Sequence, residues 1–243
     1  MTVTSLVLLG LAALLIGFAK TAIGGVGSIA VAVFALVLPT KESTAAILLL
    51  LLVGDVVAVW HYRHHADRAL LARLIPAVLP GLALGAVVLA RVDDQTLRRA
   101  IGGLLLVLAV LQLVLARAPV PRRLGSSRAA AVATGAAAGL ATMTANAAGP
   151  VMTLYLVAQG VEKRRFLGTS ALFFFGVNLC KLPFSAGLGL FAGETVWRTV
   201  LLAPVVLLGA WVGLHTARRL SQARFDQAVL AATVVSALAL VVR

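Results

Sequence analysis

Residues 17–28 read GFAKTAIGGVGS and interrupt an apolar stretch that runs from about residue 4 to residue 38. The clustered glycines disfavour a continuous helix, because glycine gives up more conformational freedom in a helix than other residues do. Residues 139–149, GLATMTANAAG, align with residues 17–27 without a gap, and Pro150 follows them. At each place we expect a broken helix pair, or a hairpin that enters and leaves on the same face.

The rest of the chain is equally apolar. Of its 243 residues, 61% are hydrophobic and 12% are charged, whereas soluble domains are about half apolar and a quarter charged. Several apolar segments approach the roughly 20 residues of a membrane-spanning helix, which predicts an all-α, polytopic integral membrane protein. The segments are about 4–19, 26–38, 43–60, 74–90, 98–115, 128–142, 149–159, 167–187, 196–213 and 227–242.

The two halves resemble each other beyond the breaks. Lys41 aligns with Lys163, and after a slip of two residues Pro80 and Gly85 align with Pro204 and Gly209. The common order of these matches indicates an internal duplication, which is typical of secondary transporters. We expect a first repeat over 1–116, a basic linker over 117–128 and a second repeat over 129–243.

Charge then selects a topology. If each broken pair returns the chain to the face it came from, one face carries far more basic residues than the other, and the positive-inside rule places it in the cytoplasm with both termini outside. Each repeat then has a broken or re-entrant pair plus three spanning helices, so the two repeats are inverted. The richer face carries Lys20, Arg63, Arg68, Arg73, Arg117, Arg122, Arg123, Arg128, Lys163, Arg164, Arg165, Arg218, Arg219 and Arg224, and the other carries Lys41, Arg91, Arg98, Arg99, Arg198 and Arg243.

The first break has the composition of a small-anion site. A helix that starts there directs free N–H groups and its positive dipole end at the break, and Lys20 adds a full charge. The expected substrate-binding residues are Lys20, Thr21, Gly24, Gly25, Gly27 and Ser28. The alternative is that these glycines only allow close helix packing.

The second break offers donors but no lysine. Its expected binding residues are Thr142, Thr144, Asn146 and Gly149, joined by Asn178 and Lys181 from a later apolar run. A lysine inside a span is costly unless it is paired, near a helix end or beside a water-filled path. Lys181 therefore either completes this break or extends to the nearer interface.

Asp55 is framed by apolar residues and aligns next to Asn178. A membrane carboxylate is either a coupling site for a proton or cation, or a counter-ion, here for Lys20 or Lys181; we favour the ion pair. Gly168, Thr169 and Ser170 either form a gate or start a helix. The single cysteine, Cys180, cannot form an intrachain disulfide, and we expect it to pack in the core.

His61, His64 and His65 precede Asp67 at a spacing that could bind zinc. Arg63 and Arg68 would repel a cation, so we favour an interfacial anchor together with Trp60 and Tyr62 in the aromatic belt, and we expect no metal. The net charge of +13 is spread between apolar runs, which disfavours nucleic acid as a partner. No nucleophile–base set or nucleotide motif occurs, so we expect neither an enzyme nor a cofactor.

Several of these positions together resemble the TauE/SafE family of membrane permeases. They are Gly17-Phe-Ala-Lys20 with Gly24 and Gly27, Pro39 followed by Ala45-Ala46, Asp55, Pro80-Gly81 with Gly85, Gly149-Pro150, Gly168-Thr169-Ser170-Ala171, and Asn178 with Lys181. A departure is Thr142, which stands where a second lysine would make the two breaks symmetric.

The resemblance implies a carrier of sulfite, sulfonates or related sulfur-containing organic anions in the bacterial inner membrane. From the residues themselves we expect a secondary transporter of a small anion working by alternating access, with protons or a cation as a possible coupling ion and a homo-oligomer as a possible assembly. An uncoupled channel-like facilitator and a non-transporting scaffold are the alternatives.

Overall fold

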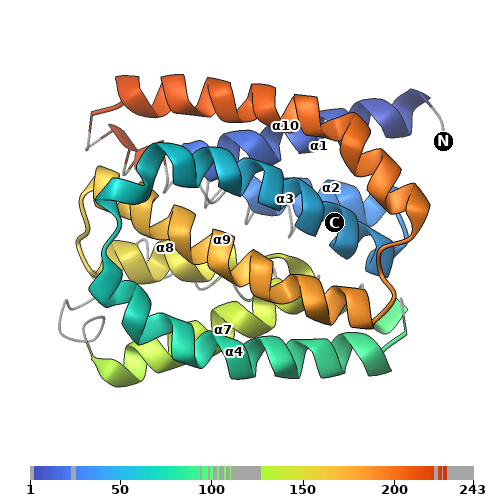
Figure 1. Cartoon of the computed structure of the whole chain (residues 1–243), viewed down its shortest axis with the longest axis horizontal. Coiled ribbons are helices and arrows are strands. Elements are labelled where there is room, and N and C mark those ends of the chain that lie inside the picture. The colour runs from blue at the N-terminus through green and yellow to red at the C-terminus, as the bar shows by residue number, and fades with distance from the viewer. Residues whose placement is uncertain are drawn as a thin grey trace.

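The computed structural model describes residues 3–22, 26–93 and 127–221, together with 95–97, 99–100, 103, 107, 110, 224–225 and 227–228. In this part of the chain the regular structure is helical, and no strand occurs. The helices lie side by side along the long axis of the molecule (Figure 1). They are α1 (Val3–Thr21), α2 (Gly27–Val37), α3 (Thr40–Tyr62), the 3-10 turn η2 (Arg63–His65), α4 (Arg68–Arg91), α7 (Arg128–Ala145), α8 (Ala148–Ala158), α9 (Lys163–Gly187) and α10 (Gly193–Arg219).

Five of the described helices are long and apolar enough to cross a membrane: α1, α3 extended through η2, α4, α9 and α10. Their outer faces keep large apolar side chains exposed, more than half so at Leu6, Val56, Leu84, Leu201 and Leu208. Lipid is the solvent that suits such a surface. The chain is therefore a multi-pass α-helical membrane protein, as its composition predicts. The expected segments 98–115 and 227–242 lie largely outside the described residues.

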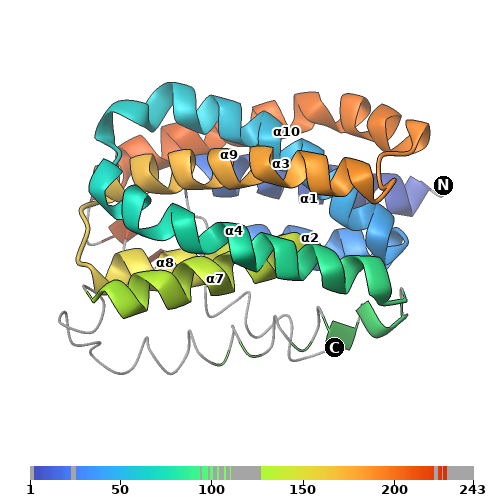
Figure 2. The same cartoon turned by 60° about the horizontal axis from the view of Figure 1, so that its bottom comes forward.

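The two short helices form hairpins with their predecessors. Each has 11 residues, about 16 Å at 1.5 Å per residue, or roughly half of the hydrocarbon thickness. Figures 1 and 2 show that α2 runs back along α1 and that α8 runs back along α7. The two hairpins open toward opposite ends of the molecule. Of the two alternatives left open by the sequence, the hairpin is the one observed.

The turn of the second hairpin follows from its sequence. Asn146 caps α7 in the left-handed region, with φ of 50°, and its N–H donates to the Thr142 carbonyl. Asparagine tolerates this conformation better than most residues do. Pro150 lies in the first turn of α8, where its missing N–H costs no helical hydrogen bond. In the first hairpin, residues 23–25 are outside the described part, and α2 begins at Gly27.

Glycines let four helices approach in two close pairs, α1 with α10 and α4 with α7. A Cβ added to Gly17 would lie 1.9 Å from the carbonyl oxygen of Val206, and one added to Gly139 would lie 2.3 Å from that of Val78. No side chain fits at such distances. Packing through small residues is the usual way membrane helices gain close contact, and these glycines are needed for that packing.

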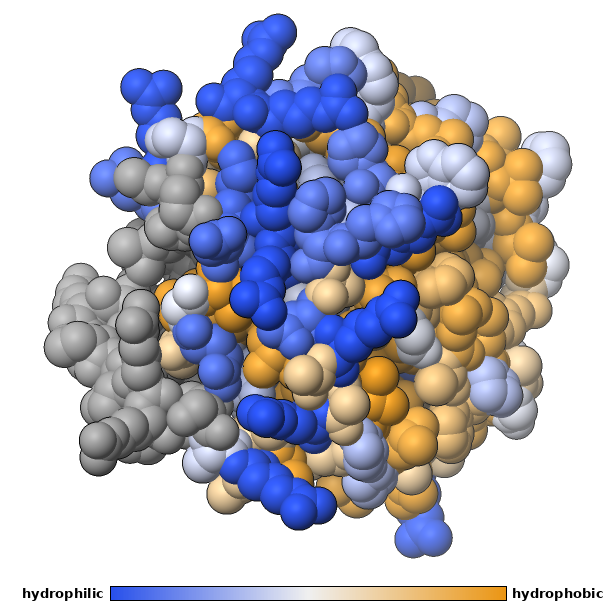
Figure 3. Space-filling model, turned by 60° about the vertical axis from the view of Figure 1, so that its left-hand side comes forward, coloured by the Kyte–Doolittle hydropathy of each residue, from blue (hydrophilic) through white to orange (hydrophobic). Residues whose placement is uncertain are grey.

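Hydrophilic side chains gather at one end of the molecule, the left-hand end of Figure 1, which Figure 3 brings forward. This end carries η2, the connection from α8 to α9 and the last turn of α10, with Arg63, Arg164 and Arg218 among its exposed residues. Arg198 at the opposite end pairs with Glu42 and Glu194. The described loops thus follow the predicted charge bias, but Lys20, which the sequence analysis counts on this face, is buried inside the protein beside Asp55.

Cys180 and Tyr62 do not lie where the sequence analysis expects them. Cys180 is exposed on α9 and does not pack in the core. Tyr62 is buried, and its hydroxyl donates to the Thr21 carbonyl at 2.9 Å, so it is not part of an aromatic belt. Its polar tip finds a backbone acceptor inside the protein. Trp60, in contrast, is exposed as expected.

Candidate functional site

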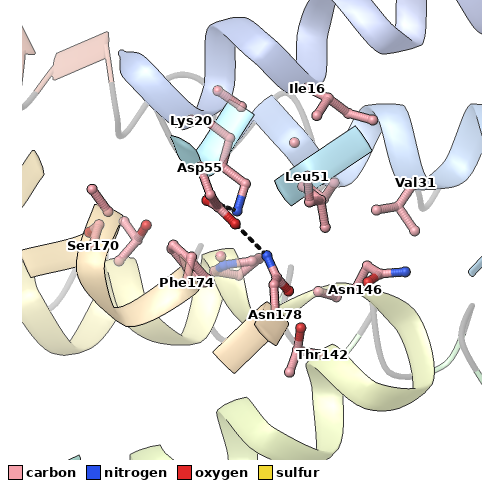
Figure 4. Close-up of a pocket in the computed structure, with 18 of the residues that line it drawn as sticks. Ile16, Lys20, Val31, Leu51, Asp55, Thr142, Asn146, Ser170, Phe174 and Asn178 are labelled. Atoms are coloured by element: carbon pink, nitrogen blue, oxygen red, sulfur yellow. Dashed lines mark hydrogen bonds and ion pairs between the residues drawn. The ribbon is translucent and has the colours of Figure 1, made fainter. Parts of the chain in front are cut away.

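A cavity of about 60 Å³ lies between the two hairpins, α3 and α9 (Figure 4). This is room for a few water molecules or one small ion, at roughly 10–15 Å³ for each water. The polar part of its lining comes from both hairpins and from α3 and α9. These polar residues are Lys20, Ser28, Asp55, Thr142, Asn146, Thr153, Ser170 and Asn178.

Lys20 and Asp55 form an ion pair at the cavity wall. The Lys20 Nζ atom lies 2.7 Å from Oδ1 of Asp55, and the two side chains are 10% and 0% exposed. Nζ also lies 4.6 Å from the centre of the Phe174 ring, an attractive cation–π arrangement. Gly54 leaves room for the lysine stem, because an added Cβ there would be 3.0 Å from Lys20 Cγ. The predicted counter-ion geometry of Asp55 is therefore present, with Lys20 as its partner.

Asn178 completes this cluster from α9. Its Nδ2 atom donates to Oδ2 of Asp55 at 2.6 Å (Figure 4). Its own Oδ1 is buried and has no hydrogen-bond partner among the described residues. An unpartnered buried acceptor is costly, and here it lies beside a cavity that can hold a proton-bearing ligand or water.

Lys181, one turn further along α9, is fully buried. Its ammonium donates to the Thr142 carbonyl at 2.7 Å, to the Thr142 hydroxyl at 3.3 Å and to Asn146 Oδ1. The snorkelling alternative is therefore wrong, and Lys181 supplies the positive charge at the second break. Asn146 in turn donates to the Thr44 carbonyl at 3.0 Å, which ties this break to α3.

The other expected binding residues divide into three groups. Gly27 and Ser28, in the first turn of α2, line the cavity, as do Thr142, Asn146 and Gly149. Thr21 and Thr144 are absent from the lining: the Thr21 hydroxyl donates to the Ala210 carbonyl at 2.9 Å, and the Thr144 hydroxyl donates to the Leu140 carbonyl at 2.9 Å. Gly24 and Gly25 lie outside the described residues.

The Gly168–Ser170 segment has two environments. Gly168 packs on the backbone of the α3–α4 connection, with a built Cβ only 2.7 Å from the Tyr62 carbonyl oxygen, and the Thr169 hydroxyl accepts from the Asp67 N–H at 2.9 Å. Ser170 lines the cavity. The first two residues hold a loop against α9, and only the third faces the site.

The histidines of the predicted cluster each contact a different partner or none in common. His61 contacts Arg218 at 3.1 Å, His64 contacts Arg63 at 3.2 Å, and Asp67 pairs with Arg165 at 2.6 Å. Asp67 also caps α4 through the N–H groups of Ala69 and Leu70. These side chains serve the basic loops and do not converge on a common point.

Sequence reasoning missed Phe174 and Thr153, which both line the cavity. For Phe174 a signal existed: it lies four residues after Ser170 and four before Asn178, so all three share one face of α9. Thr153 lies one turn after Pro150 in a short apolar helix, and nothing in its neighbourhood distinguishes it from a packing residue.

Comparison with known proteins gives one match. The family model described as sulfite exporter TauE/SafE covers residues 9–240 of the 243. No curated protein and no solved structure matches the chain. The match includes both hairpins, the cavity and nearly all of the chain, so the protein belongs to the sulfite exporter TauE/SafE family of membrane transporters.

Proposed function

We propose that the chain is a secondary transporter that carries a small anion, sulfite or a related sulfur-containing organic anion, by alternating access. The observation that carries the proposal is Lys20, whose ammonium lies at the wall of a small cavity enclosed by two helix hairpins. An ionisable side chain inside a membrane protein is costly and usually marks an ion or substrate path. The match to the sulfite exporter family supports the substrate class.

The cavity lining suits an anion at Lys20. Ser28 lines the cavity with a hydroxyl-bearing side chain, and α2 begins at Gly27, so the positive end of this helix dipole lies at the same wall. Ser170 and Asn178 complete the polar lining from α9. A volume of about 60 Å³ favours a compact oxyanion over a large organic one.

Asp55 then has a defined part in the cycle. Lys20 is already paired with it at 2.7 Å, so an arriving anion replaces the carboxylate at the ammonium. A carboxylate left beside a second anion is repelled unless it takes up a proton. We assign Asp55 as counter-ion in the empty site and as the proton-coupling site when the anion is bound. Lys181 supports the opposite wall through Thr142 and Asn146.

Two inverted repeats account for the packing. The α1–α2 and α7–α8 hairpins open toward opposite ends of the molecule, α4 packs on α7 as α10 packs on α1, and α3 meets α9 between them. Exchanging the two halves reproduces this set of contacts. Inverted repeats with a site between broken helices are the usual architecture of alternating-access carriers.

The glycine contacts refine the alignment of the two halves. Gly81 meets the Ala136 carbonyl and Gly209 meets the Leu14 carbonyl, with added Cβ distances of 2.3 and 2.1 Å. Leu14 and Ala136 correspond in the gapless alignment of the breaks, so Gly81 corresponds to Gly209. This pairing differs by about one helical turn from the sequence-based one, in which Gly85 aligns with Gly209.

The remaining parts of the proposal concern placement. The basic loops support a topology with the end that carries η2 in the cytoplasm and both termini outside, and the family resemblance supports the bacterial inner membrane as its location. A homo-oligomer is compatible with the exposed apolar faces. The competing functions are an uncoupled anion facilitator and a non-transporting scaffold.

Purified protein reconstituted in liposomes tests the proposal with radiolabelled sulfite, thiosulfate and an organosulfonate. We expect sulfite uptake that Lys20→Ala abolishes, while Arg128→Gln, a charge change on an exposed helix end, leaves uptake unchanged. Uptake that is insensitive to a proton gradient supports the facilitator, and absence of uptake of every anion by a folded protein supports the scaffold.

A further inference from the structure

A second cleft opens on the basic end of the molecule, between α3, α9 and α10. We call it the His61 cleft; its lining residues are His61, Tyr62, His65, Lys163, Arg164, Leu167, Ala217 and Arg218. Among the residues that the structure describes, no carboxylate lines this cleft, and both arginines are exposed. A cleft lined by one sign of charge concentrates counter-ions and raises their rate of arrival, so this cleft attracts small anions.

The His61 cleft ends at the wall of the central cavity. Leu167 lines both spaces. Tyr62, on the opposite side of the cleft, donates its hydroxyl to the carbonyl of Thr21, the residue that follows Lys20. Leu167 and the Tyr62–Thr21 contact therefore lie between the cleft and the Lys20 site.

Two neighbouring clefts at the same end are poorer routes. One is lined by Arg63, His64 and Leu172, and the other by Asp67, Glu162 and Arg165. Neither shares a lining residue with the central cavity, and the second presents two carboxylates, which repel an anion.

Side-chain contacts fix the shape of the His61 cleft. Lys163 donates to the carbonyls of Ala217, at 3.1 Å, and of Leu220, which holds the end of α10 against the start of α9. Arg218 contacts His61 across the cleft at 3.1 Å. Arg164 also lines the cleft and is exposed, so a cation lies at its entrance.

From this arrangement we infer that the His61 cleft is the port through which a small oxyanion passes between the cytoplasm and the central cavity, and that Leu167 and the Tyr62–Thr21 contact close it. The inference rests on the proposed transport function and adds the route and the residues that select for negative charge along it.

Thiol labelling tests the port directly. Leu167→Cys is made in a Cys180→Ser background, and an anionic methanethiosulfonate is added on the cytoplasmic side of reconstituted protein. We expect labelling that saturating methanesulfonate, a compact organosulfonate that does not react with the reagent, slows at least threefold, and loss of methanesulfonate flux after modification. The matched control is Leu172→Cys on the same helix, which lines a neighbouring cleft. Methanesulfonate leaves its labelling rate unchanged, and modification spares flux.

Labelling is followed by mass spectrometry, so it does not depend on transport. If the background protein transports neither sulfite nor methanesulfonate, the proposed function fails, while slowing of labelling by methanesulfonate still supports an anion port. The port is overturned if Leu167→Cys does not react, if methanesulfonate does not slow its reaction, or if Leu172→Cys behaves in the same way.

Charge removal gives a second, kinetic test. In sided vesicles at low ionic strength, Arg164→Gln with Arg218→Gln should raise KM for sulfite entering from the cytoplasmic side by roughly threefold to tenfold, with kcat unchanged. Arg128→Gln removes a charge from the same face away from the cleft and should leave KM unaltered. An equal rise in KM for both variants would mean that the net charge of the whole face, and not the His61 cleft, determines KM.

Discussion

Removing either partner of the Lys20–Asp55 pair should destabilise the protein more than removing both. At 2.7 Å the direct attraction is about 6 kcal/mol for an effective dielectric constant of about 20. Most of this offsets the cost of taking two charges out of water. Asp55 is fully buried and Lys20 is 10% exposed, so either charge left alone keeps its desolvation cost. Breaking a buried pair in this way costs about 3–5 kcal/mol.

We therefore expect Lys20→Met and Asp55→Asn each to lower the free energy of unfolding by about 3–5 kcal/mol. The double variant leaves no buried charge, and Asp55→Asn keeps the shape that faces Asn178, so the double variant should lose less than either single one. Replacing a buried ion pair with uncharged groups of similar volume is often neutral.

The assay is reversible unfolding in mixed micelles, followed by the fluorescence of the three tryptophans, on the four proteins of the double-mutant cycle. The double variant should also bind no sulfite, because the ammonium is gone. Losses that simply add, or single variants as stable as the parent, would refute the reasoning, since both mean that the two charges are independently solvated.

Three further predictions concern neighbouring contacts. Gly17→Val places a side chain against the Val206 carbonyl, where even a Cβ would be 1.9 Å away. This overpacking should destabilise the protein by about 1–3 kcal/mol or more and lower its melting temperature. Gly10→Val, which meets open space, should leave the melting temperature unchanged. Lys181→Met leaves the Thr142 carbonyl and Asn146 without their donor, and sulfite flux should fall at least about tenfold, equivalent to 1.4 kcal/mol; unchanged flux would exclude Lys181 from the site. Thr169→Val leaves the Asp67 N–H without its acceptor, at a cost of about 1–3 kcal/mol and with faster hydrogen exchange at that amide.

The helices could be read from the sequence because bilayer burial imposes a simple pattern. The apolar runs predicted the described spans, and glycine and proline marked the two breaks, where backbone conformation depends on the residues themselves. The sequence offered Lys181 either as the charge of the second break or as an interfacial lysine, because an isolated lysine in an apolar run needs a partner or an interface.

The contacts that could not be predicted from the sequence depend on which way side chains point between packed helices. Asp55 had two possible lysine partners, and only the packing of α1 on α3 selects Lys20. Thr21 and Tyr62 looked like a ligand donor and an interfacial anchor, yet they bond to backbone carbonyls of other elements. Gly168 looked like part of a gate and is needed for contact with a loop. Such contacts join residues far apart in sequence.

The central claim, an alternating-access carrier that binds its anion at Lys20, is tested most directly by counterflow. Liposomes that contain the protein and unlabelled sulfite are diluted into a trace of labelled sulfite, and internal label is followed with time. A carrier predicts transient accumulation of label above its equilibrium level, and Lys20→Ala should abolish it. A parent protein that only equilibrates label, or an overshoot that survives Lys20→Ala, would contradict the account.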